Sequence, residues 1–478
     1  MRQFPWCLLL VACAAPELGE TGLDTPTDEP TDEPTGETTE DCDASWWFAD
    51  EDGDGFGDPT ARITACEAPP QHVVNGWDCN DTDAEVFPGQ LERCNGIDDD
   101  CNPSTVEEGV GWHALDSDEG EAWSDLTSDF RTGSESAPYA FTAPASGTLS
   151  LCDGVVHAAI TSEEHALTIL GRGASETALE GSGEHPGART VDGTGELVLT
   201  GLTVRAGHGG VGWQGDLVVE NVVIEGMDGQ ALAHRDGEAH LQDVVIQGNT
   251  CSVTCLHGRD GAWVLDDVRV EDNATTLGPA VVLVDTDATW TGGSLSRNVS
   301  EEGELGGGMF AHGTGTSVRL VDVGVEDNVA RYGGGLHLAD GATVTLSGAR
   351  VAGNEAEGGA GAWLDSTEGT GTLLRCQPSA ASRGAITSNT ATFSGGGVVV
   401  LDHISVDASG TTQSESTLDL RDCDLGTERD RDDNAPEDVL HVVLTECASD
   451  ASGCRDGTEE QTLDYGNAVT ACIGPDCR

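Results

Sequence analysis

The sequence contains no lysine, so all 21 of its basic residues are arginines, against 86 aspartates and glutamates. Without a lysine amine the chain cannot form a Schiff base with a carbonyl substrate. Aromatic residues make up only 4% of the chain, which excludes a large core built around aromatic rings. The formal net charge of -65 repels phosphate groups, so we expect no nucleic-acid partner. Such a chain favours divalent cations instead.

The first residues have the layout of an export signal. The apolar stretch over residues 4–12 is too short to span a bilayer as a helix. It ends in Leu10-Val11-Ala12-Cys13, which resembles the lipobox of bacterial lipoproteins. The resemblance implies a signal peptide over residues 1–12, a lipid on Cys13 that attaches the protein to a membrane, and sorting to the outer membrane. An ordinary secretory peptide with a chance cysteine is the alternative.

Residues 13–41 form an acidic segment that follows the predicted lipidation site. Thr27-Asp28-Glu29-Pro30 is repeated directly as Thr31-Asp32-Glu33-Pro34, and the segment has no basic residue. Such a composition cannot bury a core, and proline and like charges extend it. We expect a disordered tether that holds the rest of the chain away from the membrane.

Sixteen cysteines are present, and an even number remains once Cys7 leaves with the signal peptide and Cys13 is lipidated. In an exported protein disulfides are therefore expected. Spacing leaves the connectivity open, with these near neighbours as candidate pairs: Cys94/Cys101, Cys251/Cys255, Cys447/Cys454 and Cys472/Cys477. A zinc site at Cys251 and Cys255, with His240 and His257 nearby in sequence, is the alternative for one pair.

Residues 42–109 form an acidic, cysteine-containing module that begins with a calcium-type loop. Asp50-Glu51-Asp52-Gly53-Asp54-Gly55-Phe56-Gly57-Asp58 alternates carboxylates, offers the Phe56 carbonyl and places a glycine at the sharp turn. Ala61 stands where such loops carry a closing glutamate, so another segment must complete the coordination.

Two further acidic knots follow, Asp78-Cys79-Asn80-Asp81-Thr82-Asp83 and Asp98-Asp99-Asp100-Cys101-Asn102. Carboxylates packed this densely repel one another unless a cation lies between them. A solvated acidic face without a specific site is the alternative. We predict Ca²⁺ as the cofactor, with these metal-binding residues: Asp50, Asp52, Asp54, Phe56, Asp58, Asp78, Asn80, Asp83, Asp98, Asp100 and Asn102.

The order of elements in this module closely resembles a family of modules common in myxobacterial and related surface proteins. The resemblance is carried by Trp46-Trp47-Phe48, the Asp-Gly loop, Cys66-x-x-Pro69, Asp78-Cys79-Asn80-Asp81 and Glu92-x-Cys94-Asn95-Gly96. The family is described as metal-binding and is named after a copper-binding methanotroph protein. Copper is therefore the weaker alternative, because Cu(II) favours imidazole and only His72 is close by. Asn102-Pro103 departs from the family pattern, which weakens a third full site.

Over residues 145–425 one phrase recurs every 20 to 30 residues or so: alternating apolar residues, a corner, a Val/Ile pair, then Gly or Asn. This period predicts a right-handed parallel β-helix, preceded by a connector and N-terminal cap at 110–144 and followed by a cysteine-containing cap at 426–478. The opening strands resemble pectin-lyase-like β-helices, and the later Gly-Gly-Gly phrases resemble repeats of polymorphic outer-membrane proteins. Six asparagines close coils and are expected to stack as a ladder that tolerates a left-handed corner: Asn249, Asn273, Asn298, Asn328, Asn354 and Asn389.

The sequence favours a calcium-stabilised binding or adhesion protein at the cell surface, with carbohydrate or another surface protein as its partner. Many β-helices cleave polysaccharides, so a lyase or hydrolase is the alternative, and a purely structural envelope role is a third. The candidate catalytic groups are Asp266 and Asp267 with Arg269 and Asp272, or His312 and His337. Each stands where a turn or packing residue would stand anyway, so we predict no catalytic site.

Overall fold

The computed structural model describes the protein as mainly β, with a single four-residue helix among its described residues. These residues are 44–115, 122–182, 189–302, 306–366, 370–407, 410–413, 416–426, 434–435, 438–447, 457–464 and 472–473. The predicted signal peptide, Cys13 and the tether up to residue 41 lie outside them. No helix in the described part is long and apolar enough to cross a membrane.

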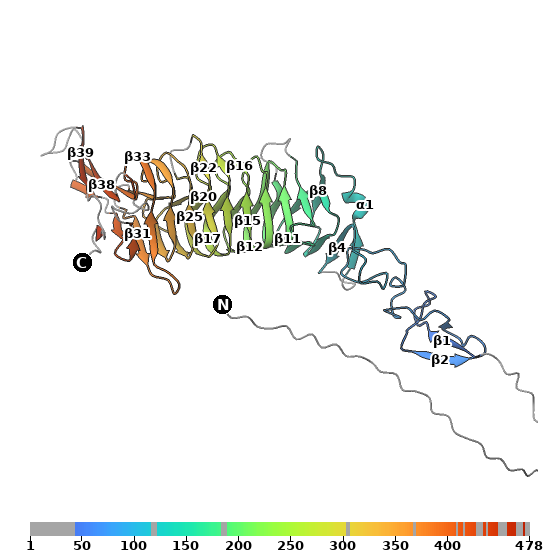
Figure 1. Ribbon diagram of the computed structural model, residues 1–478. Coiled ribbons are helices and arrows are strands. Elements are labelled where there is room, and N and C mark those ends of the chain that lie inside the picture. Colours follow the sequence, from blue (N-terminus) through green and yellow to red (C-terminus); the bar gives the residue numbers. More distant parts are fainter. Residues whose placement is uncertain are drawn as a thin grey trace, which may run out of the picture.

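The acidic module is a loop-rich unit with one small sheet at the N-terminal end of the molecule (Figure 1). Strand β1 (Ser45–Ala49) lies between β2 (Arg62–Ala65) and β3 (His72–Val73), antiparallel to both. From β3 to residue 109 the module has no further strand, so turns and side-chain contacts hold its shape.

A cap connects the module to the main stack of strands. It contains β4 (Val110–Ala114), β5 (Ala122–Asp125), α1 (Thr127–Phe130), β6 (Tyr139–Thr142) and β7 (Gly147–Leu151). Strand β4 pairs antiparallel with β5 and β7, and the rings of Trp112, Phe130, Tyr139 and Phe141 pack together over the end of the core. The cap therefore shields the first coil, which would otherwise expose its apolar interior.

Beyond the cap, strands from successive repeats pair in parallel and stack along one axis (Figure 1). The first column of strands runs through β6, β8 (Val155–Ser162), the first parts of β11 (Arg189–Arg205) and β12 (Gly209–Glu225), β13 (Leu232–Arg235), β17 (Leu256–Asp266), β20 (Val281–Thr291), β23 (Met309–His312), β26 (Leu336–Ala339), β30 (Ala362–Ser366), β34 (Val398–Asp407) and β38 (Val439–Cys447).

The second column runs through β7, β9 (Leu167–Gly171), the middle of β11 and β12, β14 (Glu238–Gln242), the ends of β17 and β20, β24 (Ser317–Val321), β27 (Thr343–Ser347), β31 (Leu373–Gln377) and β36 (Thr417–Asp419). The third runs through the start of β8, β10 (Ala178–Glu180), the ends of β11 and β12, β15 (Val245–Gln247), β18 (Arg269–Glu271), β21 (Ser294–Ser296), β25 (Gly324–Glu326), β28 (Arg350–Ala352), β32 (Gly384–Thr387) and β37 (Cys423–Asp424).

Two short ladders form at the corners between columns. One holds β16 (Thr250–Cys251), β19 (Ala274–Thr275) and β22 (Val299–Ser300), and the other holds β29 (Glu355–Gly358) and β33 (Thr390–Ser394). At the C-terminal end β35 (Gly410–Gln413), β39 (Gly457–Asp464) and β40 (Cys472–Ile473) pair antiparallel with β34, β38 and β36. Parallel pairing thus continues to β38, beyond residue 425.

One apolar core runs through the whole stack, from Val110 to Val439. Its side chains alternate along each strand between buried and outward positions, as in β24, where Val318 and Leu320 are buried and their neighbours are not. Most of the core is Leu, Val and Ile, with Trp263 and Trp290 as its largest fully buried members. Small branched side chains therefore suffice, because each coil encloses only a narrow interior.

A ladder of buried asparagines lines one corner of the stack. The Nδ2 of each asparagine donates to the Oδ1 of the next at 2.9 to 3.0 Å, in the order Asn249, Asn273, Asn298, Asn328, Asn354, Asn389 and Asn434. The last member falls in the segment that the sequence assigns to the C-terminal cap. The expectation about the corner itself is wrong in one respect. The residue before each of the first six asparagines, not the asparagine, has positive φ: Gly248, Asp272, Arg297, Asp327, Gly353 and Ser388.

The glycine phrases lie where the backbones of consecutive coils leave no room for a side chain. A Cβ on Gly307 would meet the carbonyl oxygen of Gly334 at 2.6 Å, and one on Gly334 would meet that of Ala360 at 2.7 Å. Since both obstacles are backbone atoms, only glycine fits these two positions.

Candidate metal centre

The Asp50–Asp54 loop turns its carboxylates inward through short side-chain to backbone hydrogen bonds. Asp50 Oδ1 accepts from the Gly53 amide at 2.8 Å, and Asp52 Oδ1 accepts from the Asp54 amide at 3.2 Å. Asp54 Oδ1 accepts from the Phe56 amide at 2.7 Å. One oxygen of each carboxylate is thus fixed by the loop, which leaves the other oxygen for a different partner.

The second acidic knot closes the loop from outside. The Asp78 amide donates to the Gly57 carbonyl at 3.2 Å, and the Glu51 amide donates to Asp81 Oδ1 at 3.0 Å. These contacts bring carboxylate oxygens of Asp52, Asp54 and Asp78 within 4.8 Å of one another, and a second group joins Asp50, Asp52 and Asp81 at the same limit. Asp78 and Asp81 are therefore the distant carboxylates that lie beside the loop, which has no closing glutamate at position 61.

Three carboxylate oxygens in this cluster are buried and unpartnered. The Oδ2 atoms of Asp52, Asp54 and Asp78 are buried from solvent and accept no hydrogen bond. Asn75 Oδ1 is likewise buried and accepts no hydrogen bond. Asp78 as a residue is only 2% exposed. Burial, together with the charges of neighbouring aspartates, raises the pKa of Asp54 and of Asp78. A cation between these oxygens would satisfy the unpaired oxygens and remove the repulsion, so the donor set fits a metal ion.

The third knot forms a separate and more exposed group. Oxygens of Glu92, Asp98 and Asp100 lie within 4.8 Å of one another. Glu92 Oε1 accepts from the Asp100 amide at 2.9 Å, and burial raises the pKa of Glu92. Asp98 and Asp100 each accept from the Asn102 amide. This group resembles the first in its loop geometry, but of the two groups only the first contains buried carboxylate oxygens without a hydrogen-bond partner.

Several predicted ligands have other partners in the structure. Asp58 accepts from both the amide and the hydroxyl of Thr60, which lowers its pKa, and Asp83 accepts from the Glu85 amide. The Asn80 side chain accepts from Thr82, and the Asn102 amide group donates to Thr105. Phe56 is predicted to ligate through its backbone carbonyl, which leaves its ring free to stack on Phe87 at 5.5 Å between centroids. Of the acidic residues among these, Asp58 and Asp83 belong to no carboxylate group identified in the described part of the chain.

Two ligand candidates, Asp81 and Glu92, are absent from the sequence-based set. Both belong to motifs that the sequence makes visible, one three residues after Asp78 and the other two residues before Cys94. The missing closing glutamate was the available signal, because it required a distant carboxylate to complete the loop. Spacing alone does not say which distant carboxylate folds back.

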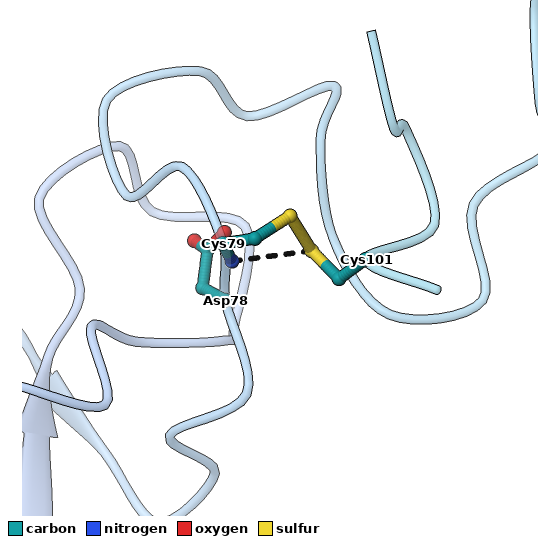
Figure 2. A group of neighbouring side chains, drawn as sticks. All are labelled: Asp78, Cys79 and Cys101. Atoms are coloured by element: carbon teal, nitrogen blue, oxygen red, sulfur yellow. Dashed lines mark hydrogen bonds between the residues drawn. A yellow bond between two sulfur atoms is a disulfide. The ribbon is translucent and has the colours of Figure 1, made fainter. Parts of the chain in front are cut away.

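Two disulfides formed by pairs of described cysteines fix the module, and they differ from the predicted pairing of Cys94 with Cys101. Cys79 is bonded to Cys101, directly beside Asp78 (Figure 2), and Cys94 is bonded to Cys152 in the cap. The buried carboxylate of Asp99 accepts from the Arg93 amide and from the Asn95 side chain, and so orients the loop between these cysteines. Proximity in sequence misled here because the third knot folds onto the second.

The other cysteines give a mixed outcome. Cys251 and Cys255 form the predicted disulfide, so their sulfurs are not free thiolates for zinc, and that alternative is wrong. A further disulfide joins Cys376 and Cys423. The side chains of the candidate pairs Cys447/Cys454 and Cys472/Cys477 lie outside the described residues.

The residues weighed for catalysis are placed as follows. Arg297 bridges Asp272 and Glu271, each at 2.8 Å. Asp267 is a corner residue with positive φ. His312 Nε2 lies 2.8 Å from Asp340, and burial lowers the pKa of the enclosed His337 to about 3.

Comparison with known proteins gives one match. A family model described as "Putative metal-binding motif" (Cu-binding MopE) matches residues 78–107. The matched segment carries Asp78, Asp81 and the group of Glu92, Asp98 and Asp100, but not the Asp50–Asp54 loop. No curated protein and no solved structure matches the chain. Over residues 78–107 the chain is similar to this metal-binding family.

Proposed function

We propose that the acidic module binds Ca²⁺ between Asp52, Asp54 and Asp78, with Asp50 and Asp81 beside them. The observation that carries this proposal is that Asp52, Asp54 and Asp78 each have a buried, unpartnered carboxylate oxygen, and that their carboxylates lie within 4.8 Å of one another. Hard oxygen donors suit calcium, whereas Cu(II) favours imidazole. None of the candidate groups among the described residues contains a histidine, and His72 Nδ1 lies 2.9 Å from the Pro70 carbonyl.

Calorimetric titration of the full mature chain with Ca²⁺, Mg²⁺ and Cu²⁺ tests the site. The paired change Asp54→Asn and Asp78→Asn should lower calcium affinity at least a hundredfold, because it removes two charged oxygens from the centre. Glu67→Gln, an exposed change in the same module, is the matched control and should leave calcium affinity unchanged. Asp58→Asn distinguishes the ligand set predicted from sequence, which includes Asp58, from the set seen in the structure, which does not. A loss of calcium affinity as large as that of the paired change would favour the sequence-based set. Copper binding in preference to calcium would contradict the proposal.

The stack is best explained as a right-handed parallel β-helix. Three columns of parallel strands, one continuous core and an asparagine ladder along one corner support this interpretation. Parallel strands joined by crossovers are almost always right-handed, which gives the hand. Fibre-like stacking of this kind suits a rod that displays its lateral faces.

For the whole protein we propose a cell-envelope lipoprotein with a calcium-stabilised binding or adhesion role. The lipobox-like end at Cys13, the acidic tether and the order of module and rod support outward projection. Cys13→Ala removes the residue that carries the acyl chains on which stable membrane attachment depends. The variant should therefore move from the membrane fraction to the soluble fraction. Retention of the variant in the membrane fraction would contradict lipid anchoring.

A further inference from the structure

A hollow of about 660 Å³ lies on the first column of strands, over β11, β12, β13 and β17. We call it the arginine hollow, and define it by Arg189, Arg235, Arg259, Gln230, His257 and Trp213. The parallel register places Gln214, Arg235 and Arg259 at the same position in three consecutive coils. Because equivalent positions in stacked coils are only about 4.8 Å apart, these side chains line one side of the hollow as a row.

Small residues create the depression between the larger ones. Gly212 and Ala233 stand between Asp192 and His257 in the register of four coils. A Cβ on Gly212 would clash with the guanidinium of Arg189, which therefore lies directly across this glycine. The Arg189 Nη1 donates to the Val211 carbonyl at 3.3 Å, so the guanidinium is held on the surface of the sheet.

A chain of polar contacts crosses the floor of the hollow. Arg189 Nη2 donates to Gln230 Oε1 at 3.2 Å, and Gln230 Nε2 lies 3.4 Å from His257 Nδ1. Burial, and then the charges of Arg259, Arg235 and Arg189, lower the pKa of His257. The imidazole therefore stays neutral and can hydrogen-bond a ligand as donor or acceptor.

Three guanidiniums converge here in a chain whose acidic residues outnumber its arginines 86 to 21. Arg189 lies 3.9 Å from Asp192 and Arg259 lies 3.3 Å from Asp260, with both arginines partly exposed. Arg235 is exposed and forms no ion pair within the described part of the molecule. Asp192 also lines the hollow, and Asp236 accepts from Gln214 Nε2 at 2.9 Å, so the guanidinium that is left for an anion is that of Arg235.

The position of the hollow selects the kind of anion. Peptides are commonly bound at a free sheet edge or in an apolar groove, whereas this column is paired on both sides and the hollow is lined by amides, imidazole and guanidinium. Guanidinium forks match carboxylate and sulfate groups, and the neighbouring amides suit hydroxyls. We propose that the arginine hollow binds an acidic oligosaccharide through its carboxylate or sulfate groups. This deepens the proposed binding role by naming a ligand class, and rests on it.

Binding is measured by calorimetry on the full mature chain with four probes: an oligogalacturonate, a sulfated oligosaccharide, a neutral cello-oligosaccharide and a poly-glutamate peptide. We expect one or both acidic saccharides to bind, and the preferred one identifies the anionic group. Arg235→Gln and Arg259→Gln should each weaken binding roughly tenfold or more. Arg350→Gln, an exposed arginine on the third column, is the matched control and should leave affinity unchanged.

Three results would overturn the inference: binding of neither acidic saccharide, unchanged affinity in the Arg235→Gln/Arg259→Gln double variant, or equally tight binding of poly-glutamate. Calcium could also bridge an acidic saccharide to the module, so the titration is repeated with Asp54→Asn/Asp78→Asn, which should keep its saccharide affinity. If calcium binds but saccharide does not, only this inference fails. If saccharide binds but calcium does not, only the proposed metal centre fails.

Discussion

The acidic module and the stacked coils differ in what occupies their interiors. In the module the most buried polar groups are carboxylates, Asp78 and Asp99, and the disulfides Cys79–Cys101 and Cys94–Cys152 tie the loops together. In the stack the interior is aliphatic, and its buried polar side chains include asparagines that bond to one another. We therefore expect the first region to depend on a cation and on covalent links, whereas the second depends on apolar burial and on repetition.

Among the changes that test this comparison, we expect the largest loss of stability from a substitution in the middle of the asparagine ladder. Asn328→Ala removes the acceptor for Asn298 and the donor to the Leu295 carbonyl, and both partners are buried. We expect a loss of about 3–5 kcal/mol in the unfolding free energy of the stack, because buried polar groups are left unpaired. Urea unfolding followed by tryptophan fluorescence measures it.

The exposed Thr289→Ala, in the same stack, should change stability by less than about 0.5 kcal/mol. The calcium affinity of Asn328→Ala should equal that of the wild type. If Asn328→Ala lowered calcium affinity as well as stability, the module and the stack would form one cooperative unit, which would contradict the comparison above.

A smaller effect is expected at the module disulfides. Replacing Cys79 and Cys101 by alanine opens a link across 22 residues and should cost about 3 kcal/mol. Replacing Cys251 and Cys255 opens a link across only 4 residues and should cost about 2 kcal/mol by the same loop argument, in the stack rather than in the module. Limited proteolysis, read by mass spectrometry, locates the loosened region. If the Cys79/Cys101 variant were cleaved equally in the module and in the stack, the two regions would not be stabilised independently.

The smallest effect concerns pH and a buried histidine in the stack. Burial lowers the pKa of His337 to about 3, so the unfolded chain takes up a proton there before the folded chain does. The stability that neutral His337 contributes is complete above about pH 6.5 and is lost as pH falls towards 3, at up to about 1.4 kcal/mol per pH unit. His337→Phe should make the fall in stability between pH 7 and pH 5 shallower.

The exposed His240→Phe serves as the control for that measurement, since its side chain is 53% exposed. Urea unfolding at the two pH values gives the slopes. An unchanged slope in His337→Phe would mean that the ring gains access to water before the stack unfolds.

Sequence periodicity predicted the mainly β character and the stacking of asparagines, because alternation and fixed repeats depend on local residue type. It did not predict that Asp272 or Arg297 rather than the following asparagine takes the left-handed conformation. In the module the sequence identified the acidic loop, but not Asp81, nor the pairing of Cys79 with Cys101. Those depend on how loops without regular secondary structure fold over one another, and spacing does not encode that.

The disulfide between Cys94 and Cys152 has a mechanical consequence. Tension applied from the N-terminal side reaches the stack through this sulfur bridge, and the intervening chain, which includes β4, α1 and β7, carries no load. Because Cys94 lies between Cys79 and Cys101 in the sequence, force reaches Cys94 along two parallel paths, one through residues 79–94 and one through the Cys79–Cys101 bridge and residues 94–101. A stack pulled from its N-terminal side would therefore yield in the coils beyond Cys152 before its cap opened.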